Sequence, residues 1–234
     1  MNIDKFTIAS FIDHTNVKAD ATTDDIKKLC SEAVEYKFHS VCITPFRVKD
    51  AKNFLSGKET EIICVVGFPF GFTTTQEKVL EAQTAISDGA TEIDMVINIG
   101  TVKDNNWQYV EDEIRQIADS IKPIGLKVIM EIGFLTKDEL TKACQVAERA
   151  GAKFVKTATG YGPRTPTSED IKIMREAVSK QIQIKASGGI HDLETAKSMI
   201  EAGADRIGTS SGLQIISVEG QKKRLPESAK KGSE

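Results

Sequence analysis

The amino-acid sequence predicts a single α/β domain folded as a closed (β/α)8 barrel. Short apolar segments rich in Ile and Val alternate with segments of helical periodicity along most of the chain. This alternation is typical of parallel strands that are buried on both faces and joined by helical crossovers. The 234 residues suit one such barrel, and no shift in composition divides them. We expect the barrel to occupy residues 1–218, followed by a loosely ordered tail at 219–234 that lacks apolar periodicity.

The predicted elements follow one another in strict alternation. Eight strands are expected at 11–13, 40–44, 61–66, 91–98, 127–132, 153–158, 182–186 and 206–209. Seven helices are expected at 23–36, 48–55, 75–87, 106–120, 137–149, 168–179 and 192–201. Capping boxes support three of the helix starts: Thr74 with Glu77, Thr136 with Glu139, and Thr167 with Asp170.

Composition excludes several classes of function. Hydrophobic residues make up 40% and charged residues 28% of the chain, as in soluble globular proteins, and the net charge is −3. This balance offers no strong attraction for nucleic acid or for an anionic membrane surface. No apolar run is long enough to span a bilayer, and the first residues lack the apolar core of a signal peptide. We therefore expect a cytoplasmic protein that binds neither nucleic acid nor membrane.

One short pattern occurs three times and gives the main clue to function. Three predicted helices end in Gly-Ala and lead into a strand, with the glycines placed to form left-handed helix caps: Gly89, Gly151 and Gly203. The residues five positions further on are Asp94, Lys156 and Gly208. They fall in predicted strands 4, 6 and 8, and alternate strands of a barrel contribute to the same interior layer. A carboxylate, an amine and a gap for a ligand are thus expected around the barrel axis. Unpaired charge is costly in such a buried position, so the charged residues there indicate a chemical role.

Two lysines on adjacent strands predict amine chemistry. Lys156 ends predicted strand 6 and Lys185 ends predicted strand 7. A second ammonium group about 6 Å away, at an effective dielectric of about 20, disfavours a protonated amine by about 2.8 kcal/mol. Together with Asp94, this is a credible arrangement for an amine that attacks carbonyl carbon. Two alternatives stay open: the three side chains form a purely structural network, and Asp94 either transfers protons or only orients the lysines.

Two glycine-rich loops predict a phosphate site. Ser187-Gly188-Gly189 follows predicted strand 7, and Gly208-Thr209-Ser210-Ser211-Gly212 follows predicted strand 8. In barrels of this type these two loops commonly hold phosphate, because glycine lets backbone N–H groups approach the anion. Gly160, after strand 6, is a candidate third contact.

Cysteine and histidine give weaker signals. The four cysteines show no Cys-x-x-Cys spacing and read as small apolar fillers, although Cys42 is also a candidate to face the site from strand 2. His14, His39 and His191 have no Cys or carboxylate neighbour at ligand spacing, so no metal site is expected.

Several motifs, taken in order, resemble the deoxyribose-phosphate aldolase family. They are Ile12-Asp13-His14-Thr15, Ser40-Val41-Cys42-Ile43-Thr44-Pro45, Val66-Gly67-Phe68-Pro69-Phe70-Gly71, Glu92-Ile93-Asp94-Met95-Val96, Val155-Lys156-Thr157-Ala158-Thr159-Gly160, Lys185-Ala186-Ser187-Gly188-Gly189-Ile190 and Gly208-Thr209-Ser210-Ser211-Gly212. The resemblance runs to about Ser217 and implies a TIM barrel. The chain departs from the family in having His191 where Arg is usual.

The resemblance implies a class I aldolase that reversibly cleaves 2-deoxy-D-ribose 5-phosphate to D-glyceraldehyde 3-phosphate and acetaldehyde, in deoxynucleoside breakdown. It implies Lys156 as the Schiff-base lysine and Asp94 and Lys185 as proton-transfer partners. It further implies phosphate contacts from Gly160, Gly188, Gly189, Gly208, Ser210 and Ser211, and substrate contacts from Asp13 and Thr15. The resemblance implies no metal or other cofactor. It does imply a homo-oligomer, either a dimer or a tetramer.

Two rival functions are compatible with the same residues. A phosphosugar isomerase or epimerase would use Asp94 as a base with no covalent step. A non-catalytic phosphosugar-binding barrel would use only the glycine-rich loops. Borohydride sensitivity separates the first rival from the aldolase, and product detection separates the second.

Overall fold

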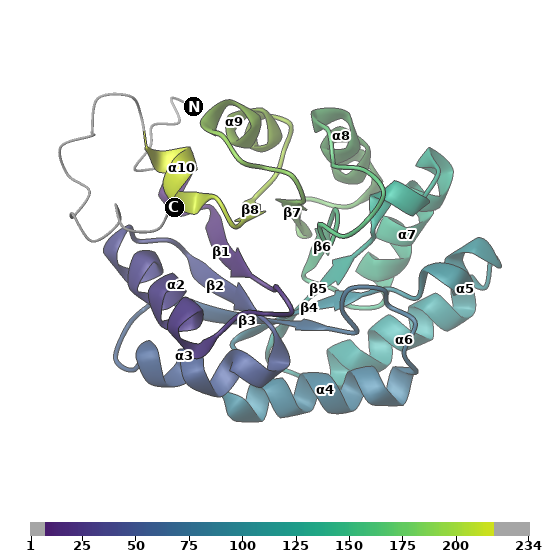
Figure 1. Cartoon of the computed structure of the whole chain (residues 1–234). Helices are drawn as coiled ribbons and strands as arrows, with labels where there is room; N and C mark the ends of the chain where they lie inside the picture. The colour runs from purple at the N-terminus through teal and green to yellow at the C-terminus, as the bar shows by residue number, and fades with distance from the viewer. Residues whose placement is uncertain (1–7, 218–234) are drawn as a thin grey trace.

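The computed structural model of this chain describes residues 8–217, so the tail predicted at 219–234 lies outside the described residues. Eight parallel strands form a closed barrel in chain order, with β8 paired to β1, and the helices surround it (Figure 1). The predicted (β/α)8 architecture is therefore confirmed. The strands are β1 (Ile12–Asn16), β2 (Ser40–Ile43), β3 (Glu61–Val66), β4 (Glu92–Val96), β5 (Gly125–Ile129), β6 (Phe154–Lys156), β7 (Gln183–Ser187) and β8 (Arg206–Thr209).

Each crossover between strands carries at least one helix. The α-helices are α2 (Thr23–Glu35), α3 (Val48–Phe54), α4 (Thr75–Asp88), α5 (Ile99–Lys103), α6 (Trp107–Ser120), α7 (Lys137–Arg149), α8 (Ser168–Ala177), α9 (Leu193–Glu201) and α10 (Gly212–Ile216). Two 3-10 turns, η1 (Pro45–Arg47) and η2 (Ile132–Phe134), follow β2 and β5. Within residues 8–217, every helix is too short or too polar to cross a membrane.

The strands separate two cores because side chains alternate between the faces of a strand. The outer core, between sheet and helices, takes Val41, Ile43, Cys64 and Val66 from β2 and β3. A second, small cluster inside the barrel takes Cys42, Ile63 and Val65 from the same two strands. The register of apolar residues thus fixes which positions face the barrel axis.

The same alternation turns the charged residues inward. Ile93, Met95, Val155, Ile184 and Ala186 belong to the outer core. Their neighbours Asp94, Lys156 and Lys185 therefore project into the barrel, where all three are buried. The outward apolar side chains hold the helices in place, and the interior is left free for polar groups.

The predicted helix caps are present. Thr74, Thr136 and Thr167 each form a capping box, with Glu77, Glu139 and Asp170 respectively. Left-handed glycines follow helices α4, α7 and α9, with φ of 119° at Gly89, 95° at Gly151 and 116° at Gly203. The helix ends that set the start of β4, β6 and β8 are accordingly those expected from the repeated Gly-Ala pattern.

Several element boundaries differ from the sequence-based expectation, among them those of β1, β4 and β5. β1 extends to Asn16, beyond the predicted end at 13, because its polar residues read as a loop although they pair with β2. β5 begins at Gly125 and ends at Ile129, earlier than the predicted 127–132, because Glu131 adopts a left-handed conformation with φ of 52°. The predicted strand 91–98 ends at Val96, since Asn98 caps the unpredicted short helix α5.

Candidate active site

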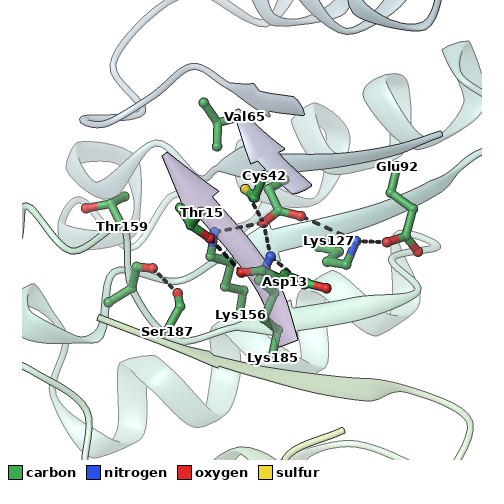
Figure 2. Close-up of polar contacts among 12 residues, drawn as sticks. Asp13, Thr15, Cys42, Val65, Glu92, Lys127, Lys156, Thr159, Lys185 and Ser187 are labelled. Atoms are coloured by element: carbon green, nitrogen blue, oxygen red, sulfur yellow. Dashed lines mark hydrogen bonds and ion pairs between the residues drawn. The ribbon is translucent and has the colours of Figure 1, made fainter. Parts of the chain in front are cut away.

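Two lysines from neighbouring strands meet one carboxylate inside the barrel. Lys156 and Lys185 are register partners on β6 and β7. Asp94 Oδ2, from β4, accepts hydrogen bonds from Lys156 Nζ at 2.7 Å and from Lys185 Nζ at 2.8 Å (Figure 2). The structure thus brings together the three residues predicted to carry the chemistry, with both ammonium groups on a single oxygen.

The surroundings of Asp94 and Lys185 favour the charged forms of these two groups. Burial by itself would raise the pKa of the Asp94 carboxyl group, but attraction to Lys156, Lys185 and Lys127 outweighs burial and lowers that pKa far below its usual range. Burial would lower the pKa of Lys185, but Asp13 and Asp94 raise it well above its usual value. Asp94 is therefore an ionised, weak base, and Lys185 is a permanent cation at neutral pH.

Asp13 is a charge partner of Lys185. Asp13 Oδ2 lies 2.7 Å from Lys185 Nζ, and Asp13 Oδ1 accepts a hydrogen bond from Ser40 Oγ at 2.8 Å. Burial acts to raise the pKa of Asp13, but Lys185 and Lys127 lower it overall. The positive charge of Lys185, predicted to act on Lys156, is consequently shared between two carboxylates.

A cavity of about 760 Å³ opens beside Lys156 and is lined by the loops that follow several strands. Eight of the predicted site residues line it: Thr15, Cys42, Lys156, Gly160, Gly188, Gly189, Gly208 and Ser210. The other four predicted site residues do not line it: Asp13, Asp94 and Lys185 are buried in the barrel interior, and Ser211 is partly exposed. Among the buried lysines Lys127, Lys156 and Lys185, only Lys156 lines the cavity, so of these three it is the amine that a bound molecule can meet.

The two predicted phosphate loops and Gly160 form one side of this cavity. Gly160, Gly188 and Gly189 have φ of 91°, 103° and 69°, which L side chains rarely adopt. A Cβ atom at Gly189 would collide with the side chain of Thr165. Around Gly160, by contrast, a Cβ atom would have open space. All three glycines line the cavity, where the absence of a side chain leaves their backbone groups accessible to a ligand.

The gap expected at Gly208 is partly filled by the protein. A Cβ atom at this position would lie 2.9 Å from Lys185 Cε and 2.8 Å from Ser187 Cβ. Gly208 therefore makes room for the Lys185 side chain as well as lining the cavity. The space expected for a ligand at Gly208 is thus shared with the Lys185 side chain.

Ser211 is engaged within the protein. Its backbone N–H donates to Thr209 Oγ1 at 2.8 Å, and its hydroxyl lies 3.0 Å from His191 Nδ1. His191 itself lines the cavity. At the cavity edge the imidazole of His191 and the loop after β8 are thus in direct contact.

Thr15 and Cys42 face the cavity from β1 and β2. Thr15 Oγ1 donates to the Asp13 carbonyl oxygen at 2.8 Å. Cys42 Sγ lies 3.9 Å from Asp94 Oδ2, and burial raises the pKa of its thiol. Cys42 is both an apolar packing residue and a residue of the cavity wall, because its side chain packs against Ile63 and Val65 and also lines the cavity.

Lys127 is a charged site residue that the sequence analysis did not identify. It lies in β5, fully buried, with its ammonium group on Glu92 and 3.5 Å from Asp94 Oδ1 (Figure 2). No Gly-Ala pair precedes β5, so the repeat does not mark this strand. The available signal is one lysine in the otherwise apolar run Gly-Leu-Lys-Val-Ile.

Glu131 and Thr159 form a second feature without a sequence signal. Glu131 Oε2 accepts the backbone N–H of Thr159 at 3.1 Å and also its hydroxyl hydrogen. Thr159 Oγ1 in turn accepts the backbone N–H of Tyr161 at 3.0 Å. Glu131 therefore anchors the cavity-lining loop that begins just after Lys156.

Tyr161 joins three loops at the cavity mouth. Its hydroxyl donates to the Val17 carbonyl oxygen at 3.2 Å, and its ring meets Phe68 edge-on at a centroid distance of 5.6 Å. Tyr161, Val17 and Phe68 all line the cavity. The loops after β1, β3 and β6 are thus linked across the opening.

One histidine does lie among carboxylates. His39, Glu61 and Glu92 place potential ligand atoms within 4.8 Å of one another, although they are distant in sequence. Arg206 Nη2 lies 3.1 Å from His39 Nε2, and Lys127 pairs with Glu92. Cationic side chains of the protein already neutralise this group, which disfavours a metal ion there.

Comparison with known proteins agrees with this geometry. Residues 7–217 match the DeoC/LacD family of aldolases. The deoxyribose-phosphate aldolase of Aciduliprofundum boonei is 50% identical over 216 residues, covering 92% of this chain and 97% of that protein. That of a Thermoanaerobacter species is 49% identical over 212 residues, covering 89% and 95%.

A solved structure supports the same relationship. The tetrameric deoxyribose phosphate aldolase from Aeropyrum pernix superposes with a TM-score of 0.86 at 30% identity, covering 95% of this chain and 94% of that one. The resemblance noted in the motifs thus extends over nearly the whole chain. With the barrel, the buried lysine pair and the matched residues all in agreement, the chain belongs to the DeoC/LacD family of aldolases.

Proposed function

We propose that the protein reversibly cleaves 2-deoxy-D-ribose 5-phosphate to D-glyceraldehyde 3-phosphate and acetaldehyde through a Schiff base on Lys156. The observation that carries this proposal is the position of Lys156. It is the interior lysine that lines the cavity, and its amine is held beside Asp94 and Lys185. The names of the relatives supply the substrate, and the cavity supplies a place for it.

The covalent step begins at the open-chain aldehyde of the sugar. The Lys156 amine attacks C1, and loss of water from the carbinolamine leaves an iminium ion. Removal of the proton from the C3 hydroxyl group breaks the C2–C3 bond, and the electron pair moves into the iminium. D-glyceraldehyde 3-phosphate leaves, and the remaining enamine is protonated and hydrolysed to acetaldehyde and free lysine. The iminium is the electron sink, so the reaction calls for no metal or organic cofactor.

Asp94 and Lys185 serve proton transfer and charge balance in this scheme. Because Lys156 and Lys185 bind the same oxygen of Asp94, this oxygen can relay a proton that Lys156 releases or takes up, while Lys185 keeps its positive charge beside it. The lowered pKa of Asp94 makes its carboxylate a weak base, so the proton of the C3 hydroxyl group is removed through a water molecule or side-chain hydroxyl group that contacts this network. Asp13 keeps Lys185 in place and charged.

The phosphate group is expected at the side of the cavity formed by the loops after β6, β7 and β8. Gly160, Gly188, Gly189, Gly208 and Ser210 line that side. Positive φ angles at three of these glycines let the backbone approach an anion closely. Ser211 stays a weaker candidate, because its N–H is already bonded to Thr209.

The assembly and location of the protein form part of the proposal. A homo-oligomer is supported by the tetrameric relative from Aeropyrum pernix. A cytoplasmic location is supported by the four buried, free cysteines, since such thiols persist in reducing compartments. Exposed Phe46, Phe70, Phe72 and Leu80 are available for subunit contacts.

Turnover with product identification tests the proposal. The enzyme is incubated with 2-deoxy-D-ribose 5-phosphate, and acetaldehyde is measured through NADH oxidation by alcohol dehydrogenase. Formation of acetaldehyde and glyceraldehyde 3-phosphate in equal amounts supports the aldolase. An isomerised or epimerised pentose phosphate, or binding without turnover, would contradict it.

A further inference from the structure

A third lysine stands behind the site, out of reach of any bound molecule. Lys127 is fully buried in the barrel interior, and it does not line the cavity. Its ammonium group contacts Glu92, lies 3.5 Å from Asp94 Oδ1, and lies 5.1 Å from the centroid of the Phe154 ring. Figure 2 shows Lys127 between Glu92 and the cluster around Lys156 and Lys185.

Lys127 does not need the contact with Asp94 to compensate its own buried charge. A buried ammonium group is tolerated when it is paired, and Glu92 already provides a partner. The second contact falls on the oxygen of Asp94 that the other two lysines leave free. Oδ2 binds Lys156 and Lys185, whereas Oδ1 has no hydrogen-bond partner among the described residues and faces the Lys127 charge. The two oxygens of the carboxylate are thus held from opposite sides.

We propose that Lys127 is a positioning residue for the aldol reaction, which fixes and balances the Asp94 carboxylate so that its other oxygen stays between Lys156 and Lys185. The inference rests on the proposed function of Asp94 and Lys156. Without Lys127, Asp94 would lose one of its three surrounding cations and be free to rotate towards the vacated side. Proton transfer at Lys156 would slow, whereas the glycine-rich loops that bind substrate phosphate would be untouched.

A purely structural role gives a different expectation. If Lys127 only neutralises Glu92, then removing both charges together should restore stability and activity alike. If Lys127 positions Asp94, removing both should restore stability without restoring turnover. The double variant Lys127→Met with Glu92→Gln separates these cases, because it leaves no unpaired buried charge at Glu92.

The chain offers a matched control pair. Lys78 and Glu113 form a second buried Lys–Glu pair within residues 8–217, at 2.9 Å, with Lys78 Nζ also donating to the Val96 carbonyl oxygen at 2.9 Å. This pair lies outside the barrel interior and does not line the cavity. The double variant Lys78→Met with Glu113→Gln removes a similar buried ion pair without touching Asp94.

The experiment measures kcat, KM and the free energy of unfolding for wild type, Lys127→Met, Lys127→Met with Glu92→Gln, Glu92→Gln and the control pair. We expect a drop in kcat of at least tenfold in both Lys127 variants, with KM for 2-deoxy-D-ribose 5-phosphate within twofold of wild type. The double variant should regain stability over Lys127→Met but not kcat. Glu92→Gln and the control pair should keep kcat within threefold.

Recovery of kcat in the Lys127→Met, Glu92→Gln protein would overturn the proposal, as would a tenfold loss in Glu92→Gln or in the control pair. The double variant keeps the proposal testable even if Lys127→Met alone does not fold, because it leaves no unpaired buried charge at Glu92. Wild-type turnover in the same assay tests the proposed function separately, and the ratio of variant to wild type tests the role of Lys127.

Discussion

Lys156 and Lys185 are register partners on adjacent strands, and their ammonium groups bind the same oxygen of one carboxylate. The arrangement places a permanent cation, Lys185, next to the amine that lines the cavity. Asp94 joins them, and Asp13 on the far side shares the charge of Lys185. The reactive amine therefore belongs to a buried network in which each positive charge has a carboxylate partner.

This network predicts how stability depends on pH. Burial acts to raise the pKa values of Asp13 and Asp94, but their lysine partners lower both below the ordinary value. A carboxyl group with a lowered folded-state pKa contributes stability that is present above the unfolded value, about pH 4, and is lost as pH falls through the folded value. We expect the free energy of unfolding, measured in urea, to fall as pH drops from 5 to 2.5.

The variant Asp13→Asn should reduce that slope, because one of the two carboxylates no longer takes up a proton on unfolding. The exposed Asp112→Asn provides the control, which should follow wild type. An acid slope that is equally steep in Asp13→Asn would contradict the assigned role of this carboxylate.

Gly208 predicts a steric dependence of activity. A Cβ atom there would lie 2.9 Å from Lys185 Cε and 2.8 Å from Ser187 Cβ, so Gly208→Ala must displace the Lys185 side chain. Overpacking of this kind typically costs about 1–3 kcal/mol, and we expect kcat to fall at least tenfold. In Gly100→Ala, where the added atom meets only Asn98 Oδ1 at 3.4 Å, kcat should be unchanged. Equal kcat values in the two variants would show that Lys185 tolerates displacement.

Much of the fold could be predicted from the sequence, because strands that are buried on both faces consist of short, recognisable apolar runs. Short apolar strands, threonine caps and left-handed glycines after helices α4, α7 and α9 gave the barrel and the inward register of Asp94 and Lys156. The extension of β1 to Asn16 and the start of β5 at Gly125 were not predicted, because these polar residues and this glycine resemble a loop and become strand only by pairing with partners on β2 and β4. No local pattern encodes such partners.

In the site, too, residues marked by local sequence patterns could be predicted, whereas residues that depend on distant contacts could not. Positions fixed by local repeats, such as Lys156, could be identified, as could glycine loops with unusual φ angles. Lys127 and Glu131 could not, because their importance comes from contacts with Asp94 and Thr159 that only the closed barrel creates. His39 likewise meets Glu61 only after the strands assemble.

Tyr161 predicts a contribution of the cavity mouth to binding. Its hydroxyl donates to Val17 and thereby links the loops after β1 and β6. Removing one such hydrogen bond at a half-exposed position costs about 0.5–1.5 kcal/mol, so Tyr161→Phe should raise KM about two- to tenfold with little change in kcat. Tyr109→Phe, whose hydroxyl instead accepts from Thr75 away from the cavity, should leave KM unchanged. Identical KM values for all three proteins would exclude a role for this bridge.

The cysteines predict slow thiol chemistry in the native state. Burial raises the pKa of Cys30 and of Cys144 to about 12 and also raises those of Cys42 and Cys64. A buried thiol reacts slowly, because the thiolate is the reactive form. Native protein at pH 8 should therefore show little reaction with Ellman's reagent over minutes, and unfolded protein in 6 M guanidinium chloride should show four thiols. Rapid reaction of the native protein would mean that a cysteine is accessible.

The central claim is that Lys156 forms a covalent imine with the substrate. The most direct measurement is mass spectrometry of peptides after incubation with 2-deoxy-D-ribose 5-phosphate and sodium borohydride, which reduces an imine to a stable secondary amine. The account predicts a substrate-dependent adduct on Lys156 in wild type and none in Lys156→Ala. An adduct located on Lys185 or Lys127, or one that persists in Lys156→Ala, would contradict it.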